Sequence, residues 1–153
     1  MRFALVPALA CALFASAFLP GAARAADTPP TLSGARSPTA DEVAKAQSAG
    51  AVVIDTRVAS EYADGHIKGA ISVPYREKSE KSAAFDAGQD EFNLAKLPTD
   101  KAAPIVLYCN GPECWKSYKA SVAAIKAGHK EVLWYRVGFP DWKSRNLPVG
   151  TAE

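Results

Sequence analysis

The stretch from Ile105 to Ala127 joins three segments of different character. Residues 105–108 are an apolar run, residues 109–116 form a loop rich in Gly and Pro, and residues 116–127 repeat apolar side chains with helical spacing. A buried strand that leads through a short loop into a helix is the building unit of a parallel α/β sheet. The sequence therefore predicts that Cys109 lies at the carboxyl end of a strand and at the start of a helix, where open α/β sheets bind ligands.

The predicted loop places a cysteine where an anion would be stabilised. Its Gly and Pro residues allow several backbone N–H groups to point at one spot, and the following helix adds the positive end of its dipole. Both effects favour the thiolate form of Cys109 over the thiol. The hypothesis is a nucleophilic thiolate. The alternative is that Cys109 and Cys114 are ordinary cysteines, buried or joined in a structural disulfide.

Strands and helices alternate along the rest of the chain. Thr39-Ala-Asp-Glu42 fits a capping box that opens a short helix ending near Gly50. Residues 76–103 are polar and weakly periodic, which indicates one or two short helices beside the sheet edge. Short β-branched or aromatic runs predict three further strands, at residues 51–54, 71–73 and 132–135. This alternation favours a single α/β domain with a mainly parallel sheet.

Charged residues follow the strand predicted at residues 51–54. Asp55 and Arg57 come directly after it, at the sheet edge predicted for Cys109, and His66 lies in a loop further along. Asp55 and Arg57 could take part in catalysis. Alternatively, they pair with each other or with His66 and fix the loops, because buried charges need partners.

The first 25 residues have the composition of a secretory signal peptide. Arg2 forms a short positive region, residues 3–19 are apolar, and Ala23-Arg24-Ala25 is a cleavage motif. We expect cleavage before Ala26, export to the periplasm and no stable membrane insertion afterwards; a retained membrane anchor is the alternative. Residues 26–37 are expected to be a flexible lead-in to a domain that spans residues 38–150.

Loss of the signal peptide would remove the small excess of positive charge. The full sequence has 18 Lys and Arg against 16 Asp and Glu, and Arg2 and Arg24 would leave with the signal peptide, so 16 of each sign would remain. A neutral domain gives no indication of a nucleic acid partner. The two remaining cysteines would face a compartment that permits a disulfide. The scattered histidines lack metal-site spacing, so we expect no metal and no other cofactor.

Four motifs occur in a characteristic order between residues 40 and 150. They are Val53-Ile-Asp-Thr-Arg57, Gly65-His-Ile-Lys-Gly-Ala-Ile71 followed by Val73-Pro74, the Cys109 loop with its helix, and Val132 through Trp142 with Leu147-Pro148. Together they resemble a single rhodanese-like (sulfurtransferase) domain. This resemblance implies a doubly wound, mainly parallel sheet flanked by helices, and a loop cysteine that takes up sulfane sulfur as a persulfide.

The cysteine loop departs from the usual rhodanese pattern. That pattern places six residues around the sulfur and often ends in Arg, whereas the first basic residue here is Lys116, and Cys114 lies inside the loop. Val137 stands where the family often has glycine. The loop resembles a Cys-Asn-Gly-Pro-x-Cys subset of secreted rhodaneses. The Cys114-Trp115 pair resembles small periplasmic proteins associated with quinoprotein (PQQ-dependent) oxidation pathways.

The resemblance implies an enzyme of the thiosulfate sulfurtransferase type with Cys109 as the sulfur carrier. The Cys109 thiolate would take sulfur from a small anion such as thiosulfate, and an acceptor thiol, of a protein or a small molecule, or cyanide would remove it. Lys116 could add a positive charge or point to solvent. The expected substrate-binding residues surround the sulfur: Asn110, Gly111, Pro112, Glu113, Cys114, Trp115 and Lys116.

Other functions fit the same residues. Cys109 and Cys114 could cycle between dithiol and disulfide, or Cys114 could resolve a Cys109 persulfide, if the loop brings their Cα atoms to about 4.4–6.8 Å. The domain could instead be a non-catalytic accessory protein of a periplasmic oxidation pathway. A phosphatase ranks lowest, because Trp115 stands where related cysteine phosphatases need Arg to clamp the phosphate.

Overall fold

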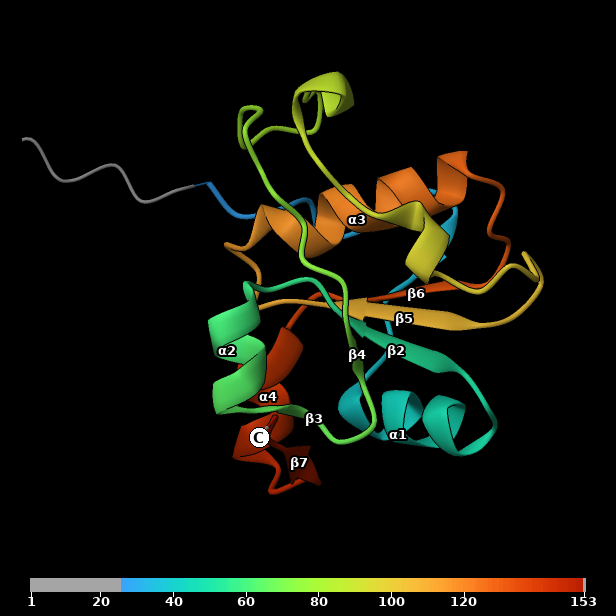
Figure 1. Cartoon of the computed structure of the whole chain (residues 1–153), viewed down its shortest axis with the longest axis vertical. Coiled ribbons are helices and arrows are strands. Elements are labelled where there is room, and N and C mark those ends of the chain that lie inside the picture. The colour runs from blue at the N-terminus through green and yellow to red at the C-terminus, as the bar shows by residue number, and fades with distance from the viewer. Residues whose placement is uncertain (1–25, 153) are drawn as a thin grey trace, which may run out of the picture.

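A five-stranded sheet forms the centre of the computed structural model, which describes residues 26–152 (Figure 1). Every neighbouring pair of its strands is parallel. The strands lie in the order β1 (Ala35–Arg36), β6 (Val132–Tyr135), β5 (Ile105–Tyr108), β2 (Val52–Asp55) and β4 (Ile71–Ser72). The predicted α/β class and parallel sheet are confirmed. The expected signal peptide lies outside the described residues.

Helices cover both faces of this sheet (Figure 1). On one side lies α3 (Trp115–Lys126), and on the other lie α1 (Ala40–Ser48) and α4 (Gly138–Ser144), while α2 (Ala59–Asp64) follows β2. A small antiparallel pair, β3 (His66–Ile67) with β7 (Val149–Gly150), lies outside the main sheet. This arrangement is the doubly wound fold that the family resemblance implies. Within residues 26–152 no helix has the length and apolarity to cross a bilayer.

The alternating side chains of the central strands build one apolar core on each face. Val53, Val106 and Leu133 share a core with residues of α1 and α4. Ile54 and Leu107 point the other way and pack with the alanines of α3. Because both faces are buried, the central strands have continuous apolar sequences with no polar positions between. This is why short apolar runs were sufficient to locate them.

Predictions that depend on contacts between residues close together in the chain are confirmed. The Thr39 hydroxyl accepts a hydrogen bond from the Glu42 N–H at 3.3 Å, and the Glu42 carboxylate accepts one from the Thr39 N–H at 2.7 Å, which is the predicted capping box. The polar segment contains two 3-10 helices of three residues each, η1 (Ala87–Gln89) and η2 (Leu94–Lys96). The sequence did not predict β1, α4 or the β3–β7 pair.

The prediction of a flexible lead-in at residues 26–37 is wrong. Its last part forms β1 beside β6. Thr28 donates two hydrogen bonds to the Pro112 carbonyl, both 2.8 Å long, from its N–H and its hydroxyl. The Arg136 guanidinium donates to the carbonyl oxygens of Thr28 and Pro29 at 2.7 and 3.0 Å. The segment is low in apolar residues, but backbone and side-chain groups of distant elements satisfy its backbone and so hold it in place.

Candidate active site

The cysteine loop lies between β5 and α3 at the carboxyl edge of the sheet. Cys109 directly follows β5 and is 1% exposed, whereas Cys114 precedes α3 as its N-cap and is partly exposed. The Cys109 carbonyl accepts a hydrogen bond of 2.9 Å from the Phe139 N–H at the start of α4. The predicted placement of Cys109, at a strand end and beside a helix start, is confirmed.

A disulfide joins Cys109 to Cys114. Their Cα atoms are 6.2 Å apart, within the range that permits such a bond. Inside the loop, the Cys114 N–H donates to the Gly111 carbonyl at 3.0 Å, and Gly111 has a φ of +124°, which favours glycine. The sequence left the state of this cysteine pair open. In this structure it is oxidised.

Gly138 brings α4 against the cysteine loop. Its φ is +64°, and a Cβ atom added there would lie 2.2 Å from the Cys109 carbonyl oxygen and 3.0 Å from the Gly111 nitrogen. No side chain fits that space without moving one of the two segments. The glycine therefore permits the approach that forms the Phe139–Cys109 backbone hydrogen bond.

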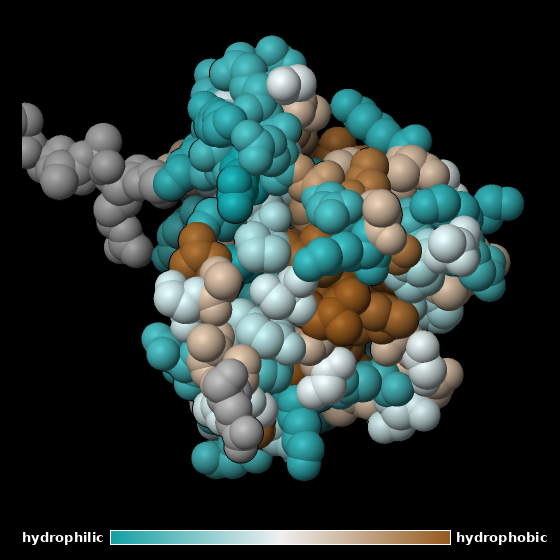
Figure 2. Space-filling view, viewed as in Figure 1, coloured by the Kyte–Doolittle hydropathy of each residue, from teal (hydrophilic) through white to brown (hydrophobic). Residues whose placement is uncertain are grey.

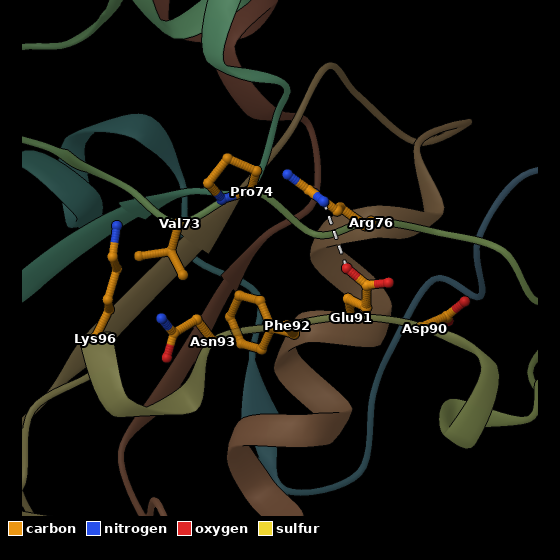
Figure 3. Close-up of a pocket in the computed structure, with 8 residues that line it drawn as sticks. All are labelled: Val73, Pro74, Arg76, Asp90, Glu91, Phe92, Asn93 and Lys96. Atoms are coloured by element: carbon orange, nitrogen blue, oxygen red, sulfur yellow. Dashed lines mark ion pairs between the residues drawn. The ribbon is translucent and has the colours of Figure 1, made fainter.

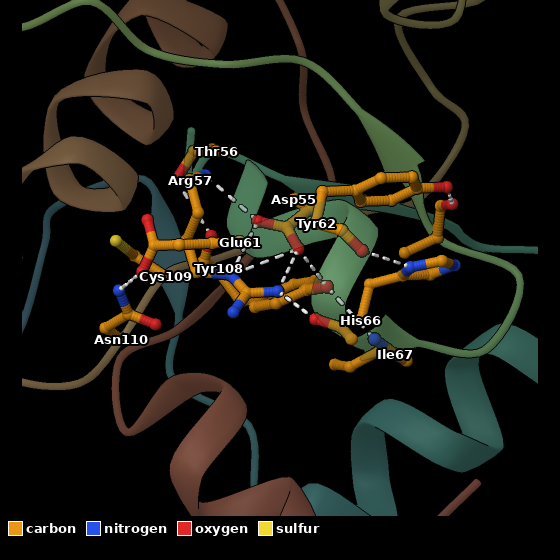
Figure 4. Close-up of polar contacts among 12 residues, drawn as sticks. Asp55, Thr56, Arg57, Glu61, Tyr62, His66, Ile67, Tyr108, Cys109 and Asn110 are labelled. Atoms are coloured by element: carbon orange, nitrogen blue, oxygen red, sulfur yellow. Dashed lines mark hydrogen bonds and ion pairs between the residues drawn. The ribbon is translucent and has the colours of Figure 1, made fainter. Parts of the chain in front are cut away.

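A buried charge pair lies beside this loop (Figure 4). The Arg57 guanidinium contacts the Asp55 carboxylate at 2.6 Å and donates to the Gly65 carbonyl at 2.6 Å. The Tyr108 hydroxyl donates to the same carboxylate at 2.6 Å. Burial raises the pKa of Tyr108, and the charge of Asp55 and this hydrogen bond raise it further. The network ties the ends of β2 and β5 to the loop after α2, which supports the interpretation that Asp55 and Arg57 fix the loops.

His66 does not join that network, so its predicted pairing with Asp55 or Arg57 is wrong. Its ring lies against the Tyr62 ring with centroids 3.8 Å apart, and its Nδ1 is 2.8 Å from the Tyr62 carbonyl oxygen (Figure 4). The cause is the short strand β3, in which consecutive side chains point to opposite sides and His66 pairs with Gly150 of β7. His66 therefore belongs to the packing of α2 and β7.

Two hollows flank Asn110. The first, of about 280 Å³, contains the exposed part of Cys114 and is lined by Glu77, Lys81, Asn110, Glu113, Cys114, Trp115 and Lys116. The second, of about 320 Å³, lies over Arg57 and Phe139. Between them, the Asn110 amide donates to the Glu61 carboxylate of α2. Of the predicted binding residues, Asn110 and Glu113 to Lys116 share the first hollow, whereas Gly111 and Pro112 shape the backbone of the loop.

A family model described as a rhodanese-like domain matches residues 39–145. The chain belongs to the rhodanese-like domain family. The match covers both strands that end at the site, the whole cysteine loop and α3. Residues 39–145 lie within the predicted domain of residues 38–150.

Sequence relatives of this rhodanese domain are longer proteins. The HTH-type transcriptional regulator Rv0324 of Mycobacterium tuberculosis is 34% identical over 112 residues, 72% of this chain and 43% of that protein. An uncharacterized protein of Buchnera aphidicola is 30% identical over 99 residues, 65% of this chain and 58% of that protein. The chain thus spans about half the length of these relatives.

Solved structures show the same fold at low identity. The BH2092 protein of Bacillus halodurans has a TM-score of 0.57 and 22% identity, covering 76% of this chain and 77% of that one. Thiosulfate sulfurtransferase from Pseudomonas aeruginosa has a TM-score of 0.56 and 23% identity, covering 78% of this chain and 21% of that one. At identities this low, the similarity shows only that the rhodanese fold is shared.

A buried lysine that sequence analysis missed shapes one wall of the first hollow. Lys119 of α3 has a fully buried side chain, and its Nζ lies 2.9 Å from the Glu77 carboxylate, 2.8 Å from the Ser79 hydroxyl and 3.7 Å from the Asp90 carboxylate. These partners belong to the polar segment 76–92, part of the hydrophilic projection at the top of Figure 2. Lys119 thereby fixes Glu77 beside the cysteine loop. The sequence does carry an indication of this burial, because Lys119 lies four residues after Trp115 and therefore on the same face of α3.

The same cluster predicts a pH-dependent stability. Burial raises the pKa of Asp90, but hydrogen bonds from the Ser79 hydroxyl and N–H, the Lys78 N–H and the Tyr75 hydroxyl outweigh burial and lower it. The folded pKa is below the unfolded value of about 3.9, so the stabilisation is fully present above that pH and is lost progressively as the pH falls from it toward the lower folded pKa. Asp90→Asn should lower the free energy of unfolding by about 2 kcal/mol at pH 7.

Urea unfolding between pH 7 and pH 3 tests this. The stability difference between the wild type and Asp90→Asn should shrink as the pH falls below about 4. The exposed Asp64 offers a control, since Asp64→Asn should change stability at pH 7 by no more than about 0.5 kcal/mol. If the stability difference between the wild type and Asp90→Asn stays the same down to pH 3, the lowered pKa of folded Asp90 is contradicted.

A hollow larger than the two beside Asn110 lies away from the cysteines. It measures about 540 Å³ and is lined by Val73, Pro74, Arg76, Asp90, Glu91, Phe92, Asn93 and Lys96 (Figure 3). An ion pair of 3.5 Å between Arg76 and Glu91 forms part of its lining, and both side chains are more than half exposed. No cysteine lines it, so size alone does not identify the reactive site. Among residues 26–152, no group of three or more His, Cys, Asp or Glu is placed to hold a metal.

Proposed function

We propose that this rhodanese domain is a sulfurtransferase in which Cys109 carries sulfane sulfur from a small anion such as thiosulfate to a thiol. The observation that carries the proposal is the position of Cys109 in the family's fold, at the carboxyl end of β5 and beside the first turn of α3. The helix dipole and the loop amides favour an anionic sulfur there. The supporting residues Asp55, Arg57 and Tyr108 hold the loops around it.

The reaction would begin from the reduced cysteine pair. The Cys109 thiolate attacks the outer sulfur of thiosulfate, the sulfur–sulfur bond of the donor breaks, and sulfite leaves with the electron pair. Cys109 then holds a persulfide. An acceptor thiolate, or cyanide in vitro, attacks the outer sulfur and regenerates the Cys109 thiolate. Lys116, which lines the first hollow, can bring positive charge to an anionic donor.

Intact mass spectrometry tests the proposal. After reduction and incubation with thiosulfate, the Cys114→Ser variant of the chain beginning at Ala26 should gain one sulfur atom, because no second thiol of the loop can remove it. Cys109→Ser should gain none, because it lacks the attacking thiolate. A sulfur atom that appears on Cys109→Ser, or no sulfur atom on Cys114→Ser, would contradict the carrier role.

A second function is favoured by the observed disulfide. Cys109 and Cys114 can cycle between dithiol and disulfide, and a periplasmic location after signal peptide cleavage would supply oxidising conditions. An accessory role in a PQQ-dependent oxidation pathway without catalysis is a further proposal, and it predicts ordinary alkylation kinetics at the reduced Cys109. A redox role alone would show as loss of two hydrogens by the chain that keeps both cysteines, with no sulfur gained by Cys114→Ser. The mass experiment therefore separates these functions.

A further inference from the structure

We infer that Cys114 is the resolving residue of the sulfur transfer, and that a dithiol is the partner that resets the site. In this inference Cys114 displaces hydrosulfide from the Cys109 persulfide and leaves the disulfide seen in the structure. The inference rests on the proposed function, since it requires that Cys109 first acquires sulfane sulfur. It assigns a fate to the sulfur and a chemical class to the acceptor.

The structure indicates which sulfur Cys114 attacks. The γ-sulfur atoms of Cys109 and Cys114 are bonded directly, so the loop brings the Cys114 sulfur to the inner sulfur of a Cys109 persulfide. The new bond joins the two γ-sulfur atoms, and the bond from Cys109 to the outer sulfur breaks. Hydrosulfide leaves with the electron pair. The sulfane sulfur is reduced to sulfide while two thiols become a disulfide, so the step needs no external oxidant.

Contacts on both sides hold Cys114 in position for this attack. Before it, the Pro112 carbonyl accepts two hydrogen bonds from Thr28. After it, the buried Trp115 donates from its indole N–H to the Ala26 carbonyl at 2.8 Å. Cys114 is also the N-cap of α3, where the positive end of the helix dipole favours its thiolate. The attacking sulfur is therefore both positioned and activated.

The two cysteines differ in their access to a partner. Cys109 is 1% exposed, whereas Cys114 is partly exposed and lines the first hollow beside Lys81 and Lys116. An incoming thiolate meets Cys114 and expels the Cys109 thiolate. Cys109 could then attack the mixed disulfide and expel a monothiol again. A dithiol escapes this reversal, because its second thiol closes its own disulfide and frees Cys114.

Single-turnover products test the inference. The reduced, desalted chain receives one equivalent of thiosulfate without added thiol or oxygen, and sulfite, sulfide and intact mass are measured. The wild type should release both sulfite and sulfide and become lighter by two hydrogens. Cys114→Ser is the matched variant, because all proteins start reduced and none depends on the disulfide at that stage. It should release sulfite only and retain one added sulfur atom.

Turnover with different thiols supplies the second readout. With excess thiosulfate, dithiothreitol should support sulfide production by the wild type at least about tenfold faster than glutathione at equal thiol concentration. Cys114→Ser should lose this preference. If the wild type retains its persulfide as Cys114→Ser does, the resolving role is overturned and the sulfurtransferase proposal stands. If Cys114→Ser gains no sulfur and releases no sulfite, both proposals fail.

Discussion

Replacing Asp55 with asparagine should lower the free energy of unfolding by about 3–5 kcal/mol. The side chains of Asp55 and Arg57 are 0% and 4% exposed, and asparagine would leave the Arg57 guanidinium buried without its counter-charge. The Tyr108 hydroxyl would also lose the carboxylate to which it donates. Urea unfolding at pH 7 measures the loss, and sulfur uptake by Cys109 should weaken with it, because the network holds the end of β5.

A double-mutant cycle separates the charge pair from simple loss of packing. Asp55→Asn combined with Arg57→Met should cost less than the two single changes added together, since the double variant buries no unpaired charge. The exposed pair Arg145–Asp141, with a contact of 3.1 Å, provides the control. Arg145→Met should change stability by no more than about 1 kcal/mol. If the effects of Asp55→Asn and Arg57→Met on the free energy of unfolding simply add in the double variant, the two side chains are not coupled.

Gly138→Ala should be the most harmful glycine substitution near the site. An alanine at a φ of +64° costs about 1–2 kcal/mol. Its Cβ would also lie 2.2 Å from the Cys109 carbonyl oxygen, and such overpacking adds about 1–3 kcal/mol. Moving α4 away would break the hydrogen bond between the Phe139 N–H and that carbonyl. We therefore expect a loss of stability and slower loading of Cys109 with sulfur.

Gly128 offers a matched control for this substitution. It also has a positive φ, +94°, but no heavy atom lies within 4 Å of a Cβ built there. Gly128→Ala should cost only the conformational term of about 1–2 kcal/mol, and it should leave sulfur loading unchanged, because it lies beyond the far end of α3. Thermal unfolding and the mass assay compare the two. If Gly138→Ala and Gly128→Ala change stability and sulfur loading equally, the role assigned to the close approach of α4 to the cysteine loop is contradicted.

Sequence patterns located the parts of the site that depend on neighbouring residues. The apolar run of β5, the Gly and Pro of the loop and the small-residue pattern of α3 predicted where Cys109 lies, because strand, turn and helix preferences act over a few residues. Asp55 and Arg57 are two positions apart, and their pairing was among the predicted arrangements. These features needed no knowledge of distant contacts.

The errors concern contacts between residues far apart in the chain. Thr28 binds the Pro112 carbonyl across 84 positions, and Arg136 reaches back 108 positions to Thr28, so composition alone made an ordered segment resemble a flexible one. His66 was assigned to the wrong partner because the β3–β7 pairing that orients it involves residues near the end of the domain. Lys119 was missed because its charge suggested exposure, while its partners lie on a separate segment.

The contacts of the N-terminal segment have a practical consequence for expression of the protein. The Ala26 carbonyl accepts the Trp115 indole N–H, and Ala26 is the residue at which we expect the mature chain to begin. An affinity tag or a protease scar fused ahead of Ala26 would therefore end next to the backbone that carries Cys114. Assays of sulfur transfer are best made on protein with a native mature N-terminus, and a tagged preparation provides a comparison that reports how strongly this end influences the cysteines.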